Sequence, residues 1–339
     1  MKASSFLGDR TAAVLPEGAL SQADRGSAEK MSENLADSSL TSPATPSEST
    51  VVIRDTTPNG TEIAYCADPR GYWVNGVSVP SVTTVLGILN KPQLVWWGQG
   101  RGVQGVIDLF DLGALTTGID WETENQYIAI PQGEDATRAE EAEIVDLLKQ
   151  HKLTVNHRLD KASERGVNVH DALEDWARLG SLPNVREFPP EEQGYVTGLL
   201  NFIEGREIQP VACEVMVGID ERGYGYAGRF DLVLEISEPV SLVTKCYPKR
   251  QDKRTEVLPG RYLVDLKTSK GVYTTHHLQL AAYEFAAVEC GYPATDGQAV
   301  LHVTSDGKYE FVLCKATPGQ FLSIRQAYGA LEKMKEEAA

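Results

Sequence analysis

The sequence predicts an α/β fold with a mixed central sheet flanked by helices, together with a helical N-terminal part. Three observations lead to this prediction. The segments from residue 136 to about 207 have helical periodicity. The apolar pattern then changes to three strand-like runs at residues 210–219, 226–236 and 261–269. A helix, a hairpin and a final helix follow, an order that is typical of an α/β core.

The size and charge of the chain limit its function. With 339 residues it is long enough for one large domain or two small ones, and 42% hydrophobic residues can form a proper core. The formal net charge of −16 argues against a protein that coats nucleic acid generally. It does not exclude an enzyme that holds nucleic acid in a local basic groove.

The sequence also indicates the cellular compartment. We find no run of about 18 apolar residues and no signal-peptide pattern in residues 1–20, so we expect no membrane span. Five cysteines are scattered singly along the chain, which is typical of a reducing cytoplasm. They are Cys66, Cys213, Cys246, Cys290 and Cys314. We therefore expect a cytoplasmic protein of a bacterial or phage-infected cell.

Residues 1–50 are rich in Ser, Ala, Glu and Asp, and we interpret them as a disordered tail, with a partner-binding arm as the alternative. Residues 51–158 form the N-terminal hairpin and helical region. A hairpin turn is predicted at Asn75-Gly76, and a helix starts at Ser81 and continues through residues 91–110. We interpret the adjacent Trp96 and Trp97 as core and groove wall, with base stacking as the alternative.

Three helices come next in the chain. They are predicted at residues 136–153, with an acidic outer face, at 154–180, and at 191–207 after Pro189-Pro190. The three strands follow. The remaining elements are a helix at 276–290, a hairpin at 298–316 that turns at Asp306-Gly307, and a last helix at 318–339.

Each of the three predicted strands carries one carboxylate in an otherwise apolar run: Glu214, Asp231 and Asp265. Buried carboxylates on neighbouring strands repel one another unless a cation lies among them. Oxygen ligands favour Mg²⁺ or Mn²⁺ over zinc. Strand alternation puts Lys267 on the same face as Asp265, next to such a cation.

Each of these residues also has an ordinary structural interpretation. Asp265 and Lys267 could form a surface ion pair at a strand end, and Glu214 could pair with Arg229. His170, on the predicted helix, could pair with Glu174 four residues later.

Five pieces of sequence, taken in order, resemble the PD-(D/E)XK nuclease superfamily, in particular its RecB-like exonuclease branch. They are "RGVNVH" with His170, "CEVMV" with Glu214, "GRFD" with Asp231, "DLKTS" with Asp265 and Lys267, and "QLAAY" with Gln279 and Tyr283. The resemblance covers residues 160–315. It implies a restriction-endonuclease-like core in residues 159–339 and a metal-dependent DNA exonuclease of phage or prokaryotic type.

The resemblance also implies roles for single residues. The metal ligands of the family correspond to His170, Asp231, Asp265 and the carbonyl of Leu266, and Lys267 takes the place of the motif lysine. Lys267 would orient the attacking water or offset charge on the phosphate. In the same interpretation Glu214 holds a second metal through water. Gln279 contacts the DNA backbone or positions the lysine, and Tyr283 packs beside Gln279.

One feature departs from the family. The CRISPR-associated relatives carry four cysteines for an iron–sulfur cluster, whereas the cysteines here are dispersed, so we expect no cluster. The implied partners are DNA with free ends and proteins of recombination or replication. Two rival functions stay open: a structure-specific endonuclease on the same fold, and a non-catalytic DNA-binding protein that kept the fold.

A basic segment, residues 241–261, joins the second and third predicted strands. It holds six cations against two acids in a chain that is acidic as a whole. We predict that it contacts the phosphate backbone of DNA, with a solvated hairpin loop as the alternative. The predicted DNA-binding residues are Lys249, Arg250, Lys253 and Arg254.

Overall fold

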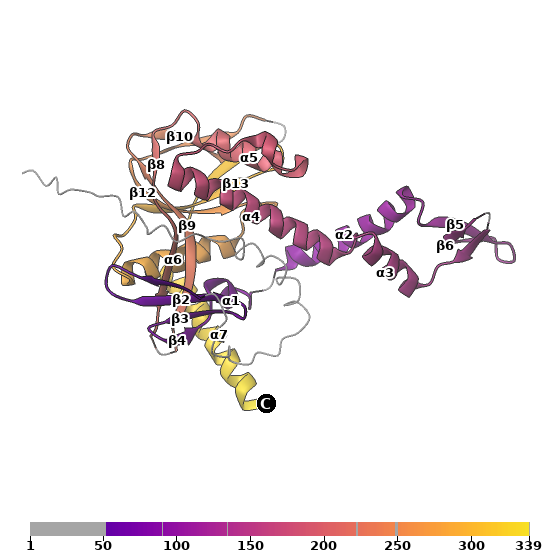
Figure 1. Cartoon of the computed structure of the whole chain (residues 1–339), viewed down its shortest axis with the longest axis horizontal. Helices are drawn as coiled ribbons and strands as arrows, with labels where there is room; N and C mark the ends of the chain where they lie inside the picture. The colour runs from indigo at the N-terminus through magenta and orange to yellow at the C-terminus, as the bar shows by residue number, and fades with distance from the viewer. Residues whose placement is uncertain (1–51, 90, 134, 222, 248–249, 339) are drawn as a thin grey trace, which may run out of the picture.

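The computed structural model describes residues 52–89, 91–133, 135–221, 223–247 and 250–338. It shows a body built on a mixed sheet, from which an elongated arm projects (Figure 1). The predicted tail at residues 1–50 and the predicted DNA-binding Lys249 lie outside the described residues.

A five-stranded sheet forms the centre of the body, with the strand order β14-β13-β12-β9-β8. Its strands are β8 (Ile208–Ile219), β9 (Tyr226–Ile236), β12 (Gly260–Lys267), β13 (Gly297–Val303) and β14 (Tyr309–Leu313). Strands β12 and β13 run parallel, and the other neighbours run antiparallel. The sheet is therefore mixed, as the sequence predicts, and the predicted hairpin turn at Asp306-Gly307 is confirmed.

Helices pack on the sheet as the apolar pattern of each helix dictates. Helices α4 (Val155–Leu179) and α5 (Pro190–Ile203) share one buried apolar cluster with the sheet, through side chains such as Leu173 and Phe202. A second cluster joins the sheet to α6 (Thr274–Glu289) and α7 (Pro318–Ala338), through side chains such as Phe321. Fully burying one such side chain contributes about 1.5–3 kcal/mol. A short 3₁₀ helix (Val185–Glu187) lies between α4 and α5.

A four-stranded antiparallel sheet precedes these elements. Its strands are β1 (Val52–Thr56), β2 (Glu62–Ala67), β3 (Arg70–Val74) and β4 (Val77–Val79). The predicted turn at Asn75-Gly76 is confirmed, and both residues have positive φ, 48° and 79°, as the tight hairpin turn requires. The sequence analysis predicted one hairpin here, but the structure has a second one, formed by β1 and β2.

The predicted helix start at Ser81 is also confirmed. The Ser81 hydroxyl caps helix α1 (Val82–Leu86) by accepting from the Thr84 N–H at 3.0 Å. The Ala227 N–H donates to the Pro80 carbonyl at 3.1 Å, so β9 is tied to the segment that leads into α1. The predicted continuation of this helix was wrong, because α1 ends at Leu86 and a separate helix starts at Pro92.

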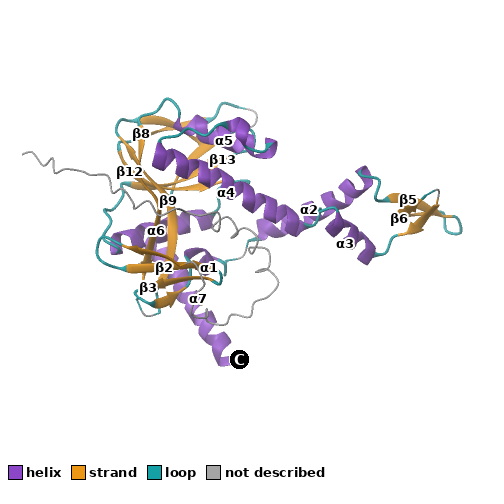
Figure 2. Cartoon of the chain, in the orientation of Figure 1, coloured by secondary structure: helices purple, strands orange, loops and turns teal. Residues whose placement is uncertain are grey.

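The arm extends from the body on the N-terminal half of α4 (Figures 1 and 2). Its elements are α2 (Pro92–Asp111), β5 (Thr116–Asp120), β6 (Asn125–Gln132), β7 (Asp135–Arg138) and α3 (Glu141–Gln150). The predicted boundary at residues 158/159 falls inside α4, so one continuous helix joins the arm to the core.

Two predictions about the arm were wrong. A helix was predicted over residues 136–153, but residues 135–138 form a strand and α3 starts after Glu140. A capping box between Glu140 and Glu143 fixes this start. Trp96 was predicted to be core or groove wall, but it is 74% exposed.

The basic segment is a hairpin of its own. Strands β10 (Val240–Lys245) and β11 (Lys253–Val257) pair antiparallel, with Leu242, Val243 and Val257 buried in the core. We call residues 240–257 the basic hairpin. Among the described residues, no helix is long and apolar enough to cross a membrane.

Candidate active site

The register of the central sheet brings the three predicted carboxylates into one row. In the β8–β9 ladder, the pairs Cys213↔Leu232 and Val215↔Phe230 leave Glu214 opposite Asp231. In the β9–β12 ladder, the last pair is Val264↔Leu232, and one further step sets Asp265 opposite Asp231. Side chains directly opposite across antiparallel strands lie about 4.5–5.5 Å apart at Cβ and share a face. The row therefore runs Glu214–Asp231–Asp265, with Asp231 in the middle.

The backbone at Glu214 departs from an ordinary strand. Its φ is +54°, in the left-handed region, although it lies inside the twelve-residue strand β8. A non-glycine residue in this region stores strain on the order of 1–3 kcal/mol, and such strain gathers at functional sites. The conformation interrupts the ladder between β8 and β9 where the Glu214 carboxylate meets Asp231.

Helix α4 adds an imidazole to the row. His170 Nδ1 lies 3.4 Å from Asp231 Oδ2. One ligand atom each from His170, Glu214 and Asp231 lies within 4.8 Å of the others, a spacing that suits a metal ion. The neighbouring α4 residues Val169 and Leu173 are buried in the core, so the helix is held firmly against the sheet.

Asp231 also contacts the backbone of the next strand. Its Oδ2 accepts a hydrogen bond of 2.7 Å from the Leu266 N–H. In an extended strand, the N–H and C=O of one residue point to the same side. The Leu266 carbonyl, which the resemblance proposes as a metal ligand, therefore points to the side of β12 on which Asp231 lies.

Asp265 and Lys267 form a close ion pair. The Lys267 Nζ lies 2.5 Å from Asp265 Oδ2, and the Asp265 side chain is almost fully buried. Apart from Lys267, no described residue donates a hydrogen bond to either oxygen of Asp265. Burial raises the pKa of Asp265 to about 6, against the lowering field of Lys267. Burial disfavours the charged Lys267, but Asp265 and Asp231 more than offset it and raise the Lys267 pKa.

Glu214 pairs with an arginine from β9. Arg229 Nε lies 2.6 Å from Glu214 Oε2, which is the ordinary pairing that the sequence left open. Burial still raises the pKa of Glu214 to about 8, and the charges of Asp231 and Glu174 act in the same direction. One arginine thus does not neutralise the carboxylate row.

The motif residues of α6 lie behind the row. Gln279 Nε2 donates to the Tyr283 hydroxyl at 3.1 Å. A Cβ on Gly228 of β9 would come within 2.5 Å of the Tyr283 ring, so the glycine in "GRFD" lets this ring pack against the strand. Burial raises the pKa of Tyr283 well above its usual value, and it stays a neutral hydrogen-bonding group at any working pH.

These residues fit a divalent cation that prefers oxygen ligands. His170, Glu214 and Asp231 supply a compact donor set, and Asp265 adds buried oxygens that receive a contact from Lys267 and no hydrogen bond from any other described residue. Such a set of carboxylates with one imidazole is suited to Mg²⁺ or Mn²⁺. Asp265 is not a member of the compact group, because its carboxylate faces Lys267.

Sequence reasoning missed several groups at this site. Arg178 on α4 forms an ion pair of 2.7 Å with Glu174, and Glu174 acts on the pKa of Glu214. Burial raises the pKa of Tyr72 on β3 to about 12, and the charge of Arg229 opposes this. The i,i+4 spacing of Glu174 and Arg178 was a usable signal. No local pattern could place β3 beside β9.

The structure describes three of the four predicted DNA-binding residues, and all three lie in the basic hairpin. Lys253 is exposed, and the Arg254 guanidinium donates to the Ser241 carbonyl at 3.2 Å. The Arg250 guanidinium lies over the Tyr247 ring, 3.7 Å from its centroid. Two of these three cations, Arg250 and Arg254, thus contact other residues of the hairpin.

The carboxylate row is expected to make the metal-free protein less stable as the pH rises. The pKa of Glu214 is about 8 in the folded protein, against 4.5 in the unfolded chain. Between these two pH values, Glu214 therefore binds more protons in the folded state than in the unfolded state. Its stabilising contribution is therefore complete below pH 4.5 and is lost as the pH rises to 8, by up to about 1.4 kcal/mol per pH unit. Asp265 acts in the same direction between pH 3.8 and 6.

Denaturant unfolding in EDTA between pH 5 and 8.5 measures this slope. Glu214→Gln should remove its part, whereas Glu238→Gln, an exposed glutamate between β9 and β10, should leave the slope unchanged. Mn²⁺ should stabilise most at high pH, because ligands bind metal when deprotonated. If the free energy of unfolding in EDTA did not change with pH, repulsion among the carboxylates of the row would not destabilise the folded protein.

No family model matches the chain, and no curated protein matches it. Six chains among the solved structures match. One is the crystal structure of SSO0001, which is 14% identical, with the match covering 53% of this chain and 66% of that chain, just under two thirds. Its TM-score is 0.26, and an agreement of this size does not establish a shared fold. The comparisons therefore assign the chain to no family.

Proposed function

We propose that this chain is a metal-dependent DNA exonuclease of the RecB-like type, with a restriction-endonuclease-like core in residues 159–339. The observation that carries the proposal is the row Glu214–Asp231–Asp265 on adjacent strands, with His170 beside Asp231 and Lys267 beside Asp265. A row of carboxylates that repel one another, beside a half-buried lysine, is an arrangement suited to phosphodiester hydrolysis with a bound cation.

Each side chain has a role in this proposal. A Mg²⁺ or Mn²⁺ ion, when bound, would supply Lewis-acid activation of the phosphate and of a water molecule. His170, Asp231, Asp265 and the Leu266 carbonyl would hold it, with Glu214 close enough to take part. Lys267 lies beside Asp265, where its ammonium can orient the attacking water or offset charge on the phosphate. Gln279 and Tyr283 support this end of the site from α6.

The substrate proposed is DNA with free ends, bound by its backbone in a cytoplasmic setting of recombination, replication or DNA degradation. Two rivals are carried with it: a structure-specific endonuclease, and a DNA-binding protein without turnover. End-labelled linear DNA and circular single-stranded DNA, each incubated with Mn²⁺, separate the three. An exonuclease degrades the linear DNA and leaves the circle intact. Cleavage of the circle supports the endonuclease, and DNA retention without product at any metal concentration supports the binding protein.

Neutralising the basic hairpin is expected to weaken DNA binding without changing metal affinity. The variant replaces Lys249, Arg250, Lys253 and Arg254 with glutamine. Each phosphate contact that is lost should reduce the slope of log K against log salt by about 0.7–0.9. The effect should be the same for unrelated DNA sequences, because backbone contacts carry no base information.

The control for this variant changes two exposed lysines on α7, Lys333 and Lys335, to glutamine. Fluorescence anisotropy with labelled DNA across a salt series measures both. If the quadruple variant keeps the wild-type slope, the basic hairpin faces away from DNA. The groove would then be sought near Lys91, Trp96, Trp97 and Arg101.

A further inference from the structure

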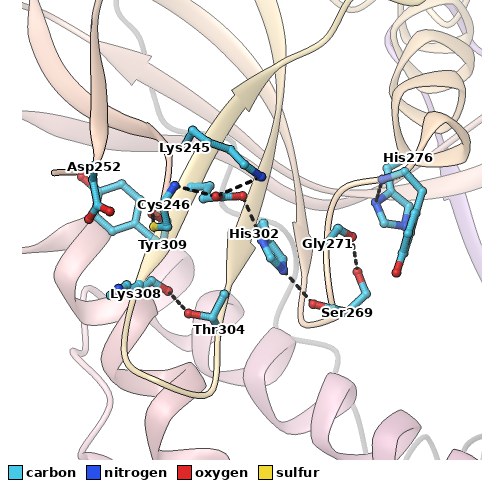
Figure 3. A network of polar contacts seen from close by, with 12 residues as sticks. Lys245, Cys246, Asp252, Ser269, Gly271, His276, His302, Thr304, Lys308 and Tyr309 are labelled. Carbon is cyan, nitrogen blue, oxygen red and sulfur yellow. Dashed lines mark hydrogen bonds and ion pairs between the residues drawn. The ribbon is translucent and has the colours of Figure 1, made fainter. Parts of the chain in front are cut away.

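A second polar cluster lies within the sheet, on the strand pair β13–β14 (Figure 3). His302 and Glu310 are directly opposite each other in this antiparallel pair. Both are buried, at 3% and 5% exposure. Replacing a buried ion pair with apolar residues of similar size is often neutral or stabilising, so stability alone does not explain why these two side chains are here.

His302 connects this pair to the active-site loop. Its Nδ1 lies 3.3 Å from Glu310 Oε2, and its Nε2 lies 2.7 Å from the Ser269 carbonyl oxygen (Figure 3). A carbonyl and a carboxylate both accept, so the ring makes both hydrogen bonds when both of its nitrogens carry a proton. Ser269 follows Lys267 by two residues, and its hydroxyl donates to the Gly271 carbonyl at 2.8 Å. The imidazole thus holds the loop that leaves the lysine end of β12.

Glu310 connects the same pair to the basic hairpin. Its Oε1 accepts from the Cys246 N–H at 2.7 Å and lies 3.5 Å from Lys245 Nζ. Burial acts to raise the pKa of Glu310, but its hydrogen bonds with His302 and the Cys246 N–H hold that pKa below its usual value. The neighbouring Tyr309 carbonyl accepts from the Cys246 thiol at 3.4 Å, so the end of β10 is attached at two points.

A continuous polar chain therefore runs from the basic hairpin through Glu310 and His302 to the loop after Lys267. Apart from the exposed Lys245, the groups in this chain are buried or half-buried, where such contacts are stronger than in water. The two ends are the segment proposed to contact DNA and the segment that carries the proposed catalytic lysine. Nothing in the nuclease motifs calls for a histidine on β13 or a glutamate on β14.

We infer that His302 and Glu310 are positioning residues that fix the loop at residues 268–273, and with it Lys267, relative to the basic hairpin. The inference deepens the proposed function and rests on it for its effect on catalysis. A displacement of about 1 Å at a reacting group can reduce the rate a hundredfold, so a rigid connection between substrate contact and lysine has a direct use. The connection itself can be tested without activity.

Two substitutions of His302 separate its two contacts. The amide nitrogen of asparagine reaches the place of Nδ1, so His302→Asn keeps the contact with Glu310 and loses the contact with Ser269. The amide nitrogen of glutamine reaches the place of Nε2, so His302→Gln keeps the contact with Ser269. Lys308→Gln is the matched control, because Lys308 is a partly exposed lysine directly before β14 that pairs with Asp306. Glu310→Gln weakens the contact with the Cys246 N–H, because a neutral acceptor replaces a charged one.

Hydrogen–deuterium exchange of the full chain reads the connection directly. In His302→Asn, the amides of residues 268–273 should exchange at least about tenfold faster, whereas His302→Gln and Lys308→Gln should match the wild type. In Glu310→Gln, the Cys246 amide should exchange faster. Equal loop exchange in wild type and His302→Asn would overturn the inference, and so would equal acceleration in the asparagine and glutamine variants, which would indicate a general packing defect.

Cleavage of end-labelled DNA with Mn²⁺ gives the second readout. His302→Asn should lower kcat about tenfold or more, with KM, DNA affinity and Mn²⁺ affinity unchanged, and His302→Gln, which keeps the contact with Ser269 but not the contact with Glu310, should lower kcat less. A fall in Mn²⁺ affinity equal to the fall in kcat would overturn the positioning role. If the wild type cleaves no DNA, the proposed function fails, and the exchange experiment still decides whether the connection exists.

Discussion

Asp231→Asn is expected to lose metal-dependent cleavage altogether and to bind Mn²⁺ at least about a hundredfold more weakly. Asp231 is the central member of the row, with Glu214 and Asp265 opposite it and the His170 ring 3.4 Å away. Changing a residue that only supports a metal ligand typically lowers metal affinity 10–100-fold, so changing a ligand itself should lower it at least as much. Isothermal titration with Mn²⁺ and a single-turnover cleavage assay measure the two effects.

The fold should survive this substitution. Asparagine keeps the volume and an oxygen that accepts from the Leu266 N–H, and it removes one charge from a repelling group. The melting temperature in EDTA should be equal to or above that of the wild type. Asp306→Asn, a carboxylate in the exposed turn between β13 and β14, serves as the control. Near-normal cleavage by Asp231→Asn would remove the carboxylate row from the chemistry.

The strands that could be predicted are the ones whose side chains are buried. Strands β8, β9 and β12 are continuous apolar runs because the sheet is covered on both faces, and such runs stand out in a sequence. Strands β7 and β11 expose most of their residues, and β5 buries none, so their composition does not differ from that of loops or helix surfaces. For this reason the helix predicted from residue 136 was wrong: residues 135–138 form the exposed strand β7.

The members of the site could be predicted, but its connections could not. Apolar runs interrupted by Glu214, Asp231 and Asp265 already indicate three buried carboxylates. Their arrangement in one row depends on the register, which local sequence does not specify until the strands pair. Pairings such as Arg229 with Glu214 were open alternatives in the sequence, and the structure selects them.

The buried polar chain shows the same limit. His302 lies in the apolar run of β13, which is a usable sign of a buried histidine, and Glu310 follows a predicted turn. Their pairing follows from the hairpin register. The contact of His302 with Ser269 joins β13 to the end of the parallel strand β12. The spacing of residues along the sequence does not predict a contact between strands that are joined by such a crossover.

Lys267→Met is expected to reduce cleavage by about a hundredfold or more, the usual size of a lost transition-state contact. Its effect on metal should be the opposite of that of Asp231→Asn. The Lys267 ammonium lies 2.5 Å from Asp265 Oδ2 and competes with a cation for that carboxylate. Removing it should leave Mn²⁺ affinity unchanged or make it tighter, while turnover at saturating metal stays low.

Measuring turnover and metal affinity together separates the two roles that Lys267 can have. If Lys267 only neutralises Asp265, turnover of Lys267→Met should be near normal once a bound metal ion neutralises Asp265 instead. A lysine that acts on the water or the phosphate leaves a deficit that no metal concentration repairs. Titration with Mn²⁺ and single-turnover cleavage over a Mn²⁺ series distinguish them, with Lys308→Met as the partly exposed control. If turnover of Lys267→Met recovered at high Mn²⁺, the lysine would be structural, and the acid–base chemistry would belong to another group near Asp265.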